Sequence, residues 1–164
     1  MSKRINTFLA VIVAIFVIAQ LIRPGKNISN EHPAHVFEKY PASEEVKGIL
    51  QRACNDCHSN NTVYPWYASI QPVASWLAHH IEEGKEHLNF SAFTARRIAV
   101  QNHKFEEIIE VIKEGEMPMG SYTLIHRDAI LSDAEKAALT QWAQTAMDSI
   151  RAHYPADSLV LKRR

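Results

Sequence analysis

The sequence contains few cysteines and few glycines, and it has no net charge. Five glycines and seven prolines are too few for a collagen-like or disordered chain. Lysine plus arginine number 18, as do aspartate plus glutamate, so no bulk positive field exists to collect a phosphate backbone. We therefore expect no nucleic-acid partner. The length of 164 residues suits one compact domain with an appendage.

The N-terminus has the charged-then-apolar order of an export signal or signal-anchor. Lys3 and Arg4 precede the apolar run from Ile5 to Ile22, which would cover roughly 27 Å as a helix, close to the hydrocarbon thickness of a bilayer. We predict a transmembrane helix within residues 1–23, with its two cations holding the N-terminus in the cytoplasm. Cleavage after the small residue Ala19 and a buried core helix are the alternatives.

The chain after this run divides by composition. Residues 24–43 contain prolines, a glycine and many polar residues without a periodic apolar face, which predicts an extended tether. Residues 44–153 carry the helical patterns of the folded domain, and residues 154–164 form a C-terminal tail. The expected arrangement is a bacterial cell-envelope protein, anchored in the inner membrane with its folded domain in the periplasm.

Both cysteines of the chain lie in one short motif, Cys54-Asn55-Asp56-Cys57-His58. This C-x-x-C-H spacing is the attachment signature of a c-type haem. Two thioethers reach the two vinyl groups of one porphyrin, and the adjacent histidine binds the iron. A zinc site, a thioredoxin-like redox pair and a structural disulfide remain open alternatives.

Helical periodicity dominates the domain. Ser43 precedes a pattern with Val46, Ile49, Leu50 and Ala53 on one face, so the cysteines follow the end of a helix. Similar patterns predict helices over 70–83 and 105–114, and Ser132 opens another through an S-x-x-E capping box. No stretch alternates as a strand. We predict an all-α fold, a small cytochrome c-like domain of four or five helices around one covalently bound haem.

The sixth iron ligand has several candidates. Met117 lies in a short Met-Pro-Met-Gly link between predicted helices, where a loop can present its sulfur to iron, and Met119 is the substitute. Met147 falls within the last helix, where core packing explains it. The rival histidines are His79, His80, His87, His103 and His126.

Other side chains are candidates for contact with the haem. Trp66, Tyr67, Trp76 and Tyr122 can line the cofactor or bond its propionates, and core packing explains them equally well. Arg96 and Arg97 can pair with propionates or lie on a solvated helix face.

The sequence resembles the bacterial haem-binding domain family, which is related to class I cytochromes c. The resemblance covers roughly residues 43–151. Its segments are Cys54–Asn60, Tyr64–Tyr67, His80 with Gly84–Ser91, Glu116–Pro118, and Leu131–Glu135 leading to Trp142. The resemblance implies thioethers at Cys54 and Cys57, a proximal ligand at His58 and a methionine ligand at Met117. It also implies a membrane-attached redox protein, of a family some of whose members accompany peroxidase-like domains.

These observations favour a monohaem c-type cytochrome that carries electrons between periplasmic redox partners and is not itself an enzyme. Two other functions remain. An open iron site beside His79, His80 or His126 would suit a peroxidase-like enzyme, and ligand exchange that moves the Met117 loop would suit a haem-based sensor.

Overall fold

The computed structural model describes residues 3–161, in which helices are the regular elements and Ile28 and Asn61 form an isolated β-bridge. The all-α prediction is therefore confirmed. The α-helices are α1 (Lys3–Ala19), α2 (Val36–Lys39), α3 (Glu44–Ala53), α4 (Asn55–His58), α5 (Val73–His87), α6 (Ile98–Glu114), α7 (Gly120–Thr123) and α8 (Asp133–His153). Four 3₁₀ turns complete them: η1 (Trp66–Ser69), η2 (Phe90–Ala95), η3 (Arg127–Ala129) and η4 (Ala156–Leu159).

Two predicted helix starts are confirmed. The Ser43 hydroxyl accepts the N–H of Val46 at the start of α3. At the start of α8, the Ser132 hydroxyl accepts from the Glu135 N–H, and the Glu135 carboxylate accepts from the Ser132 N–H. Both caps satisfy backbone donors that a helix leaves free at its first turn.

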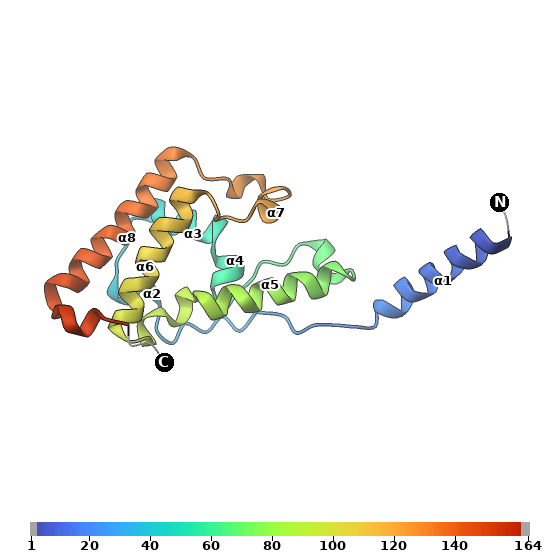
Figure 1. The fold of residues 1–164 in the computed structure, drawn as a ribbon, viewed down its shortest axis with the longest axis horizontal. Coiled ribbons are helices and arrows are strands. Elements are labelled where there is room, and N and C mark those ends of the chain that lie inside the picture. Colours follow the sequence, from blue (N-terminus) through green and yellow to red (C-terminus); the bar gives the residue numbers. More distant parts are fainter. Residues whose placement is uncertain (1–2, 162–164) are drawn as a thin grey trace.

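The core lies between α6 and α8, which run side by side (Figure 1), with α3 packed against α8. Phe105 of α6 meets Trp142 of α8 edge to face, with ring centroids 5.4 Å apart. Met147 is buried in the same layer, as its place in the helix predicted. Arg52 ties the C-terminal end of α3 to the start of α8 through Glu135. This frame fixes α3 and hence the point at which the chain enters Cys54.

The predicted transmembrane helix is wrong. Helix α1 ends at Ala19 after 17 residues, roughly 26 Å at 1.5 Å per residue against a hydrocarbon core of about 30 Å. Across residues 3–161, no helix combines the length and apolar character needed to cross a membrane. The inner-membrane localisation with a periplasmic domain rested on that helix and is corrected with it.

The helix ends where polar contacts with the domain begin. The Gln71 N–H donates to the Gln20 side chain (3.0 Å), the Gln71 amide donates to the Ile22 carbonyl (2.9 Å), and Arg23 donates to the Ser69 carbonyl (2.7 Å). These bonds join residues 20–23 to the segment before α5. Figure 1 shows α1 extending away from the other helices beyond this point.

Residues 24–43, expected as a tether, contact the domain along much of their length. The Asn27 side chain donates to the Ser59 carbonyl (2.8 Å) and to the Thr62 hydroxyl (2.9 Å). Further on, Val36 and Tyr40 are buried in the core, and the Tyr40 hydroxyl donates to Gln101 at 2.6 Å. The segment therefore supports the turn that follows His58.

Candidate functional site

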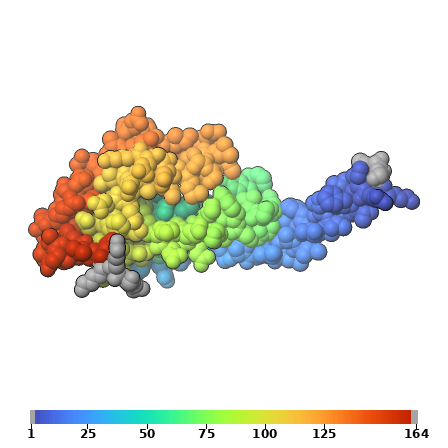
Figure 2. All heavy atoms as spheres, viewed as in Figure 1, coloured from blue at the N-terminus to red at the C-terminus, as the bar shows by residue number. Residues whose placement is uncertain are grey.

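A cavity of about 590 Å³ opens between α3, α4, α5, α6 and the loop before α7. Figure 2 shows the hollow between α6, the α7 region and α5, with teal residues at its floor. Its apolar lining includes Leu50, Ala53, Leu88, Phe90, Ile108, Val111, Ile112 and Leu131. A largely apolar cavity of this size with a few convergent polar groups is typical of a small-molecule or cofactor site.

Cys54 and Cys57 both line this cavity as free thiols. Cys54 ends α3 and begins α4, and its carbonyl accepts the N–H groups of Cys57 and His58. This single turn holds the two sulfurs and the imidazole on adjacent positions. Burial raises the pKa of Cys54 to about 12 and that of Cys57 to about 11, so both thiols stay protonated at neutral pH.

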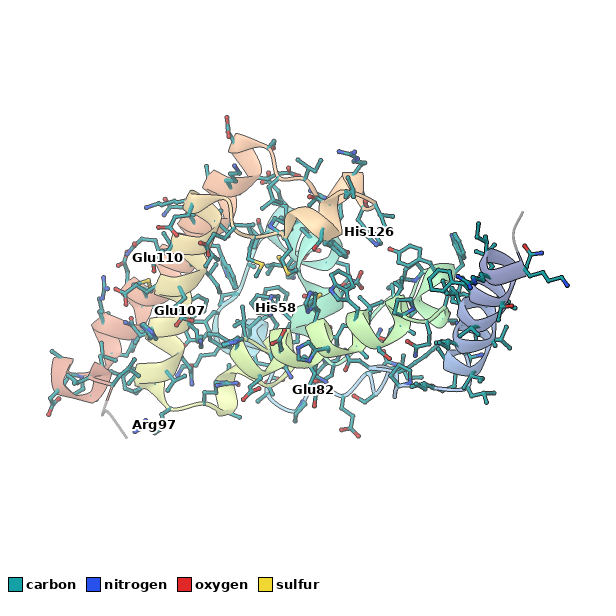
Figure 3. All side chains as sticks on the ribbon, turned by 45° about the vertical axis from the view of Figure 1, so that its right-hand side comes forward. His58, Glu82, Arg97, Glu107, Glu110 and His126 are labelled. Carbon is teal, nitrogen blue, oxygen red and sulfur yellow. The ribbon has the colours of Figure 1, made fainter. Side chains whose placement is uncertain are left out.

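His58 is held by two backbone carbonyls of the α5 end. Its Nδ1 lies 2.9 Å from the Gly84 oxygen and 3.0 Å from the Leu88 oxygen. Carbonyls only accept hydrogen bonds, so Nδ1 must carry the proton and Nε2 is the free lone pair of the neutral ring. Burial lowers the His58 pKa, which favours that neutral form. Figure 3 shows His58 in the middle of the domain between α6 and α5.

The approach of α4 to α5 depends on Gly84. A Cβ at this position would lie 2.7 Å from the Cys57 carbonyl oxygen and 3.1 Å from the Cys57 Cβ. Side chains never pack that closely, so Gly84 permits contact between the two helices. The same residue supplies a carbonyl to His58.

The segment Leu88–Ser91 packs against His58 and the residues that follow it. Asn89 donates to the Asn60 side chain at 2.9 Å, and the buried Ser91 hydroxyl accepts the Asn60 N–H at 3.1 Å. The Phe90 ring meets the His58 ring edge to face at 6.4 Å. These contacts fix the His58 ring and the chain that follows it.

The Met117–Met119 loop forms the opposite side of the cavity, which Met117, Pro118 and Met119 all line. Helix α6 ends at Gly115 in the left-handed conformation (φ 74°), and the Met117 N–H donates back to the Val111 carbonyl at 3.3 Å. The reversal after Gly115 brings the loop back over the cavity. Thus one cavity collects Cys54, Cys57, His58 and both methionine candidates.

Comparison with known proteins identifies the family of the chain. The model of the haem-binding domain family matches residues 14–145. The chain belongs to the haem-binding domain family. It is also 27% identical over 104 residues to the cytochrome c peroxidase Ccp of Escherichia coli (strain K12), a match that covers 61% of this chain and 22% of that relative. No solved structure matches the chain significantly.

The residues of this haem-binding domain fit its cofactor. The cavity offers apolar walls for a porphyrin face and, in His58, an imidazole whose outer nitrogen is already fixed by carbonyls. Metal-binding histidines are commonly held in this way. His58 would bind the iron, and the walls from α3, α5 and α6 would hold the macrocycle.

The other predicted histidines divide into two groups. His80 and His87 of α5 line the haem cavity. His79 pairs with Glu83 (3.3 Å) and His103 with Glu107 (3.0 Å), both on exposed helix faces. His126 lies outside the lining, stacked on Tyr122 and 2.9 Å from the Tyr67 hydroxyl. Only the first group is placed to meet the cofactor.

Among the predicted aromatic and arginine candidates, Tyr122 lines the haem cavity. Trp66 is 81% exposed and Trp76 packs on His80. Arg96 donates to the Glu86 carbonyl at 3.0 Å, and Arg97 precedes the first residue of α6. The arginines therefore lie outside the cavity lining.

The sequence analysis did not anticipate two features of the site: the bond that Tyr122 makes, and the position of Lys104. Tyr122 donates to Asp56 of the motif at 2.8 Å, which links the loop above the cavity to α4. Lys104 of α6 also lines the cavity. It was not among the residues expected on the buried face of this helix, which included Ile109. The glycine within α5, Gly84, was the one visible hint, because a glycine inside a helix usually marks a close approach.

The alternatives for the cysteine pair find no support. Within residues 3–161, no three His, Cys, Asp or Glu side chains gather as a metal site. The βαβ pattern of a thioredoxin-like pair is missing from the same residues, which form helices.

Proposed function

We propose that the protein is a monohaem c-type cytochrome that transfers electrons, with haem bonded to Cys54 and Cys57 and iron held by His58 and Met117. The observation that carries the proposal is the His58 ring: Nδ1 donates to the Gly84 and Leu88 carbonyls, which leaves Nε2 as an iron ligand in a cavity lined by both thiols and Met117.

Covalent attachment would join each of the two thiols to one vinyl group of the haem. Each S–H adds across one vinyl group, with sulfur joining one carbon and the hydrogen joining the other. Atoms and electrons balance, so the step needs no oxidant. The turn that holds Cys54 and Cys57 on one wall supports attachment to a single porphyrin edge.

Electron transfer follows from how the side chains enclose the cofactor. Haem supplies a one-electron iron couple when bound. The apolar walls from Leu50, Ile108 and Leu131 exclude water and so favour the less charged, reduced state. Met117, which lines the cavity, would supply a sulfur ligand to the iron. The expected partners are donor and acceptor proteins that meet the cavity mouth briefly.

A second function is favoured by one comparison, the match to a cytochrome c peroxidase. If neither Met117 nor Met119 binds iron, the acid–base candidates are His79, His80 and His126. Of these three, His80 lines the cavity, and its Nδ1 lies 3.4 Å from Glu83. A histidine held by a carboxylate can act as an acid–base group in peroxide reduction. In that case the protein would be an enzyme.

The test begins with the chain expressed together with a cytochrome-maturation system. Acid–acetone should leave the colour on the protein, and the reduced pyridine complex should show two thioether bonds. The oxidised protein should have a methionine–iron near-infrared band and no spectral response to peroxide or cyanide. Colour extracted into acetone would refute covalent attachment, and a high-spin spectrum that responds to peroxide would favour the enzyme.

Single substitutions then identify the sulfur. Met117→Ala should abolish the near-infrared band and open the iron to cyanide, whereas Met119→Ala, a matched change two residues away on the same cavity wall, should leave the band in place. The reverse pattern would assign Met119 instead. Unchanged bands in both variants would exclude a methionine ligand.

A further inference from the structure

Basic side chains line the cavity in one region besides His58. His80 and His87 come from α5, and Lys104 comes from the first half of α6. Carboxylates of Glu83 and Glu107 lie beside them on the same two helices. We call Lys104, His80 and His87 the basic wall.

Lys104 is the unusual member of the basic wall. Its side chain is only 15% exposed, although it lies on a mainly apolar cavity. An ammonium withdrawn from water in this way is costly unless anions and hydrogen bonds compensate it. One of its three N–H donors bonds the Glu107 carboxylate. The others remain suited to a second anion inside the cavity.

Haem carries two such anions. Its propionates project from the edge of the macrocycle opposite its vinyl groups, so thioether bonds to Cys54 and Cys57 direct the propionates away from α4. We propose that Lys104 and His87 bind the haem propionates. This inference rests on the proposed function, since it takes the vinyl edge to lie at α4.

The remaining polar groups around the cavity favour this assignment. Besides Lys104 and His87, the titratable groups of α5 and α6 that line the cavity are His80, Glu83, Glu107 and Glu110, and α4 contributes Asp56. The carboxylates repel propionates, and the Tyr122 phenol already donates to Asp56. His80 pairs with Glu83, and its ring packs at a tilt against the Trp76 ring with centroids 4.3 Å apart. Lys104 and His87 are therefore the donors that remain.

Arginines were the expected propionate partners, but their positions do not serve this role. The Arg96 guanidinium donates to the Glu86 carbonyl on the outer surface, and Arg97 is the residue that begins α6. Lys104 lies within α6 and lines the cavity, whereas Arg96 and Arg97 precede the first residue of α6 and do not line it. Lysine and histidine therefore take the role that was expected of the arginines.

The direct test uses the reduced, diamagnetic haem-loaded protein. Proton nuclear Overhauser contacts should join the propionate methylenes to the Lys104 side chain and the His87 ring. The proposal would be overturned if the propionate methylenes contacted the Met117–Tyr122 side of the cavity. It would also be overturned if they contacted neither Lys104 nor His87.

A second readout is the reduction potential. Lys104→Met removes a positive charge next to the cofactor and should shift the potential downward, because that charge favours the state with one more electron. Lys113→Met, on the same helix but exposed and outside the cavity, is the matched control and should shift it much less. Equal shifts in both variants would refute the role of Lys104. If Lys104→Met does not fold, the propionate contacts of the wild-type protein decide the proposal.

The two proposals fail separately. Colour lost to acid–acetone disproves the thioether bonds, yet the propionate contacts remain measurable in the haem complex. Intact thioethers with propionates remote from the basic wall disprove only the present inference.

Discussion

The His58 ring nitrogen Nδ1 lies 2.9 Å from the carbonyl oxygen of Gly84, a residue with no room for a side chain against Cys57. The His58 imidazole and the turn that carries Cys54 and Cys57 thus depend on one glycine of α5. Packing distance and hydrogen bonding reinforce each other here, because the close helix approach is what brings the carbonyl within reach.

Gly84→Ala should disturb both the close approach of α4 to α5 and the hydrogen bond from His58 to residue 84. Its Cβ would meet the Cys57 oxygen at 2.7 Å, and relief requires α5 to move away from α4. We expect a loss of about 1–3 kcal/mol in the free energy of unfolding and several-fold less haem-loaded protein, measured by denaturant unfolding and haem absorbance per protein. Gly48→Ala is the control: its Cβ meets nothing within 4 Å in α3, and it should stabilise the protein by about 0.5–1 kcal/mol. Equal behaviour of the two variants would contradict the close-approach argument.

Tyr122→Phe should loosen the loop that carries Met117 and Met119. The lost bond joins Tyr122 to Asp56 at 2.8 Å, and burial together with that bond raises the Tyr122 pKa. We expect cyanide to bind the ferric protein several-fold faster while haem attachment stays normal. Stopped-flow mixing measures this rate. Tyr154→Phe, which loses a bond to Lys39 far from the cavity, should leave it unchanged; acceleration by both would argue for general loosening.

Ser91→Ala should weaken the turn after His58. The buried Ser91 hydroxyl accepts the Asn60 N–H at 3.1 Å and lies 2.9 Å from the His32 ring. Removing a buried acceptor costs about 1–3 kcal/mol, which urea unfolding of the haem-loaded protein will measure. The exposed Ser149→Ala substitution in α8 should change stability by less than about 0.5 kcal/mol. A neutral Ser91→Ala would mean that the hydroxyl is dispensable.

Glu135→Gln should make stability less dependent on acid pH. The Ser132 N–H, the Ser132 hydroxyl and Arg52 lower the pKa of Glu135 from 4.5 to about 2. A lowered folded pKa gives stability that is complete above about pH 4.5 and is lost as pH falls toward 2. The wild type should therefore exceed the variant by about 1 kcal/mol at pH 7, with the difference vanishing near pH 2.

Urea midpoints at several pH values test this linkage. Glu44→Gln serves as the matched control, because Glu44 is 89% exposed and pairs only with Lys47 on the same helix. Its stability difference from the wild type should stay small at every pH. A constant gap between the wild type and Glu135→Gln down to pH 2 would contradict the assigned pKa.

The sequence determined the local features of this protein. Ser43 and Ser132 predicted the starts of α3 and α8 because N-caps act within one turn. The C-x-x-C-H spacing likewise predicted neighbouring thiols and imidazole, since a single turn brings them together. The apolar run did not show where α1 ends, at Ala19, nor that the next residue, Gln20, bonds Gln71, 51 positions away.

Tertiary structure alone decided which distant residues share the cavity. The α4–α5 contact selected the carbonyls for His58, and the turn at Gly115 returned Met117 to the same cavity. It also placed Lys104, and not Arg96, on the cavity wall. Periodicity shows which face of a helix is buried, but the partner of that face is set by long-range packing, which no local pattern encodes.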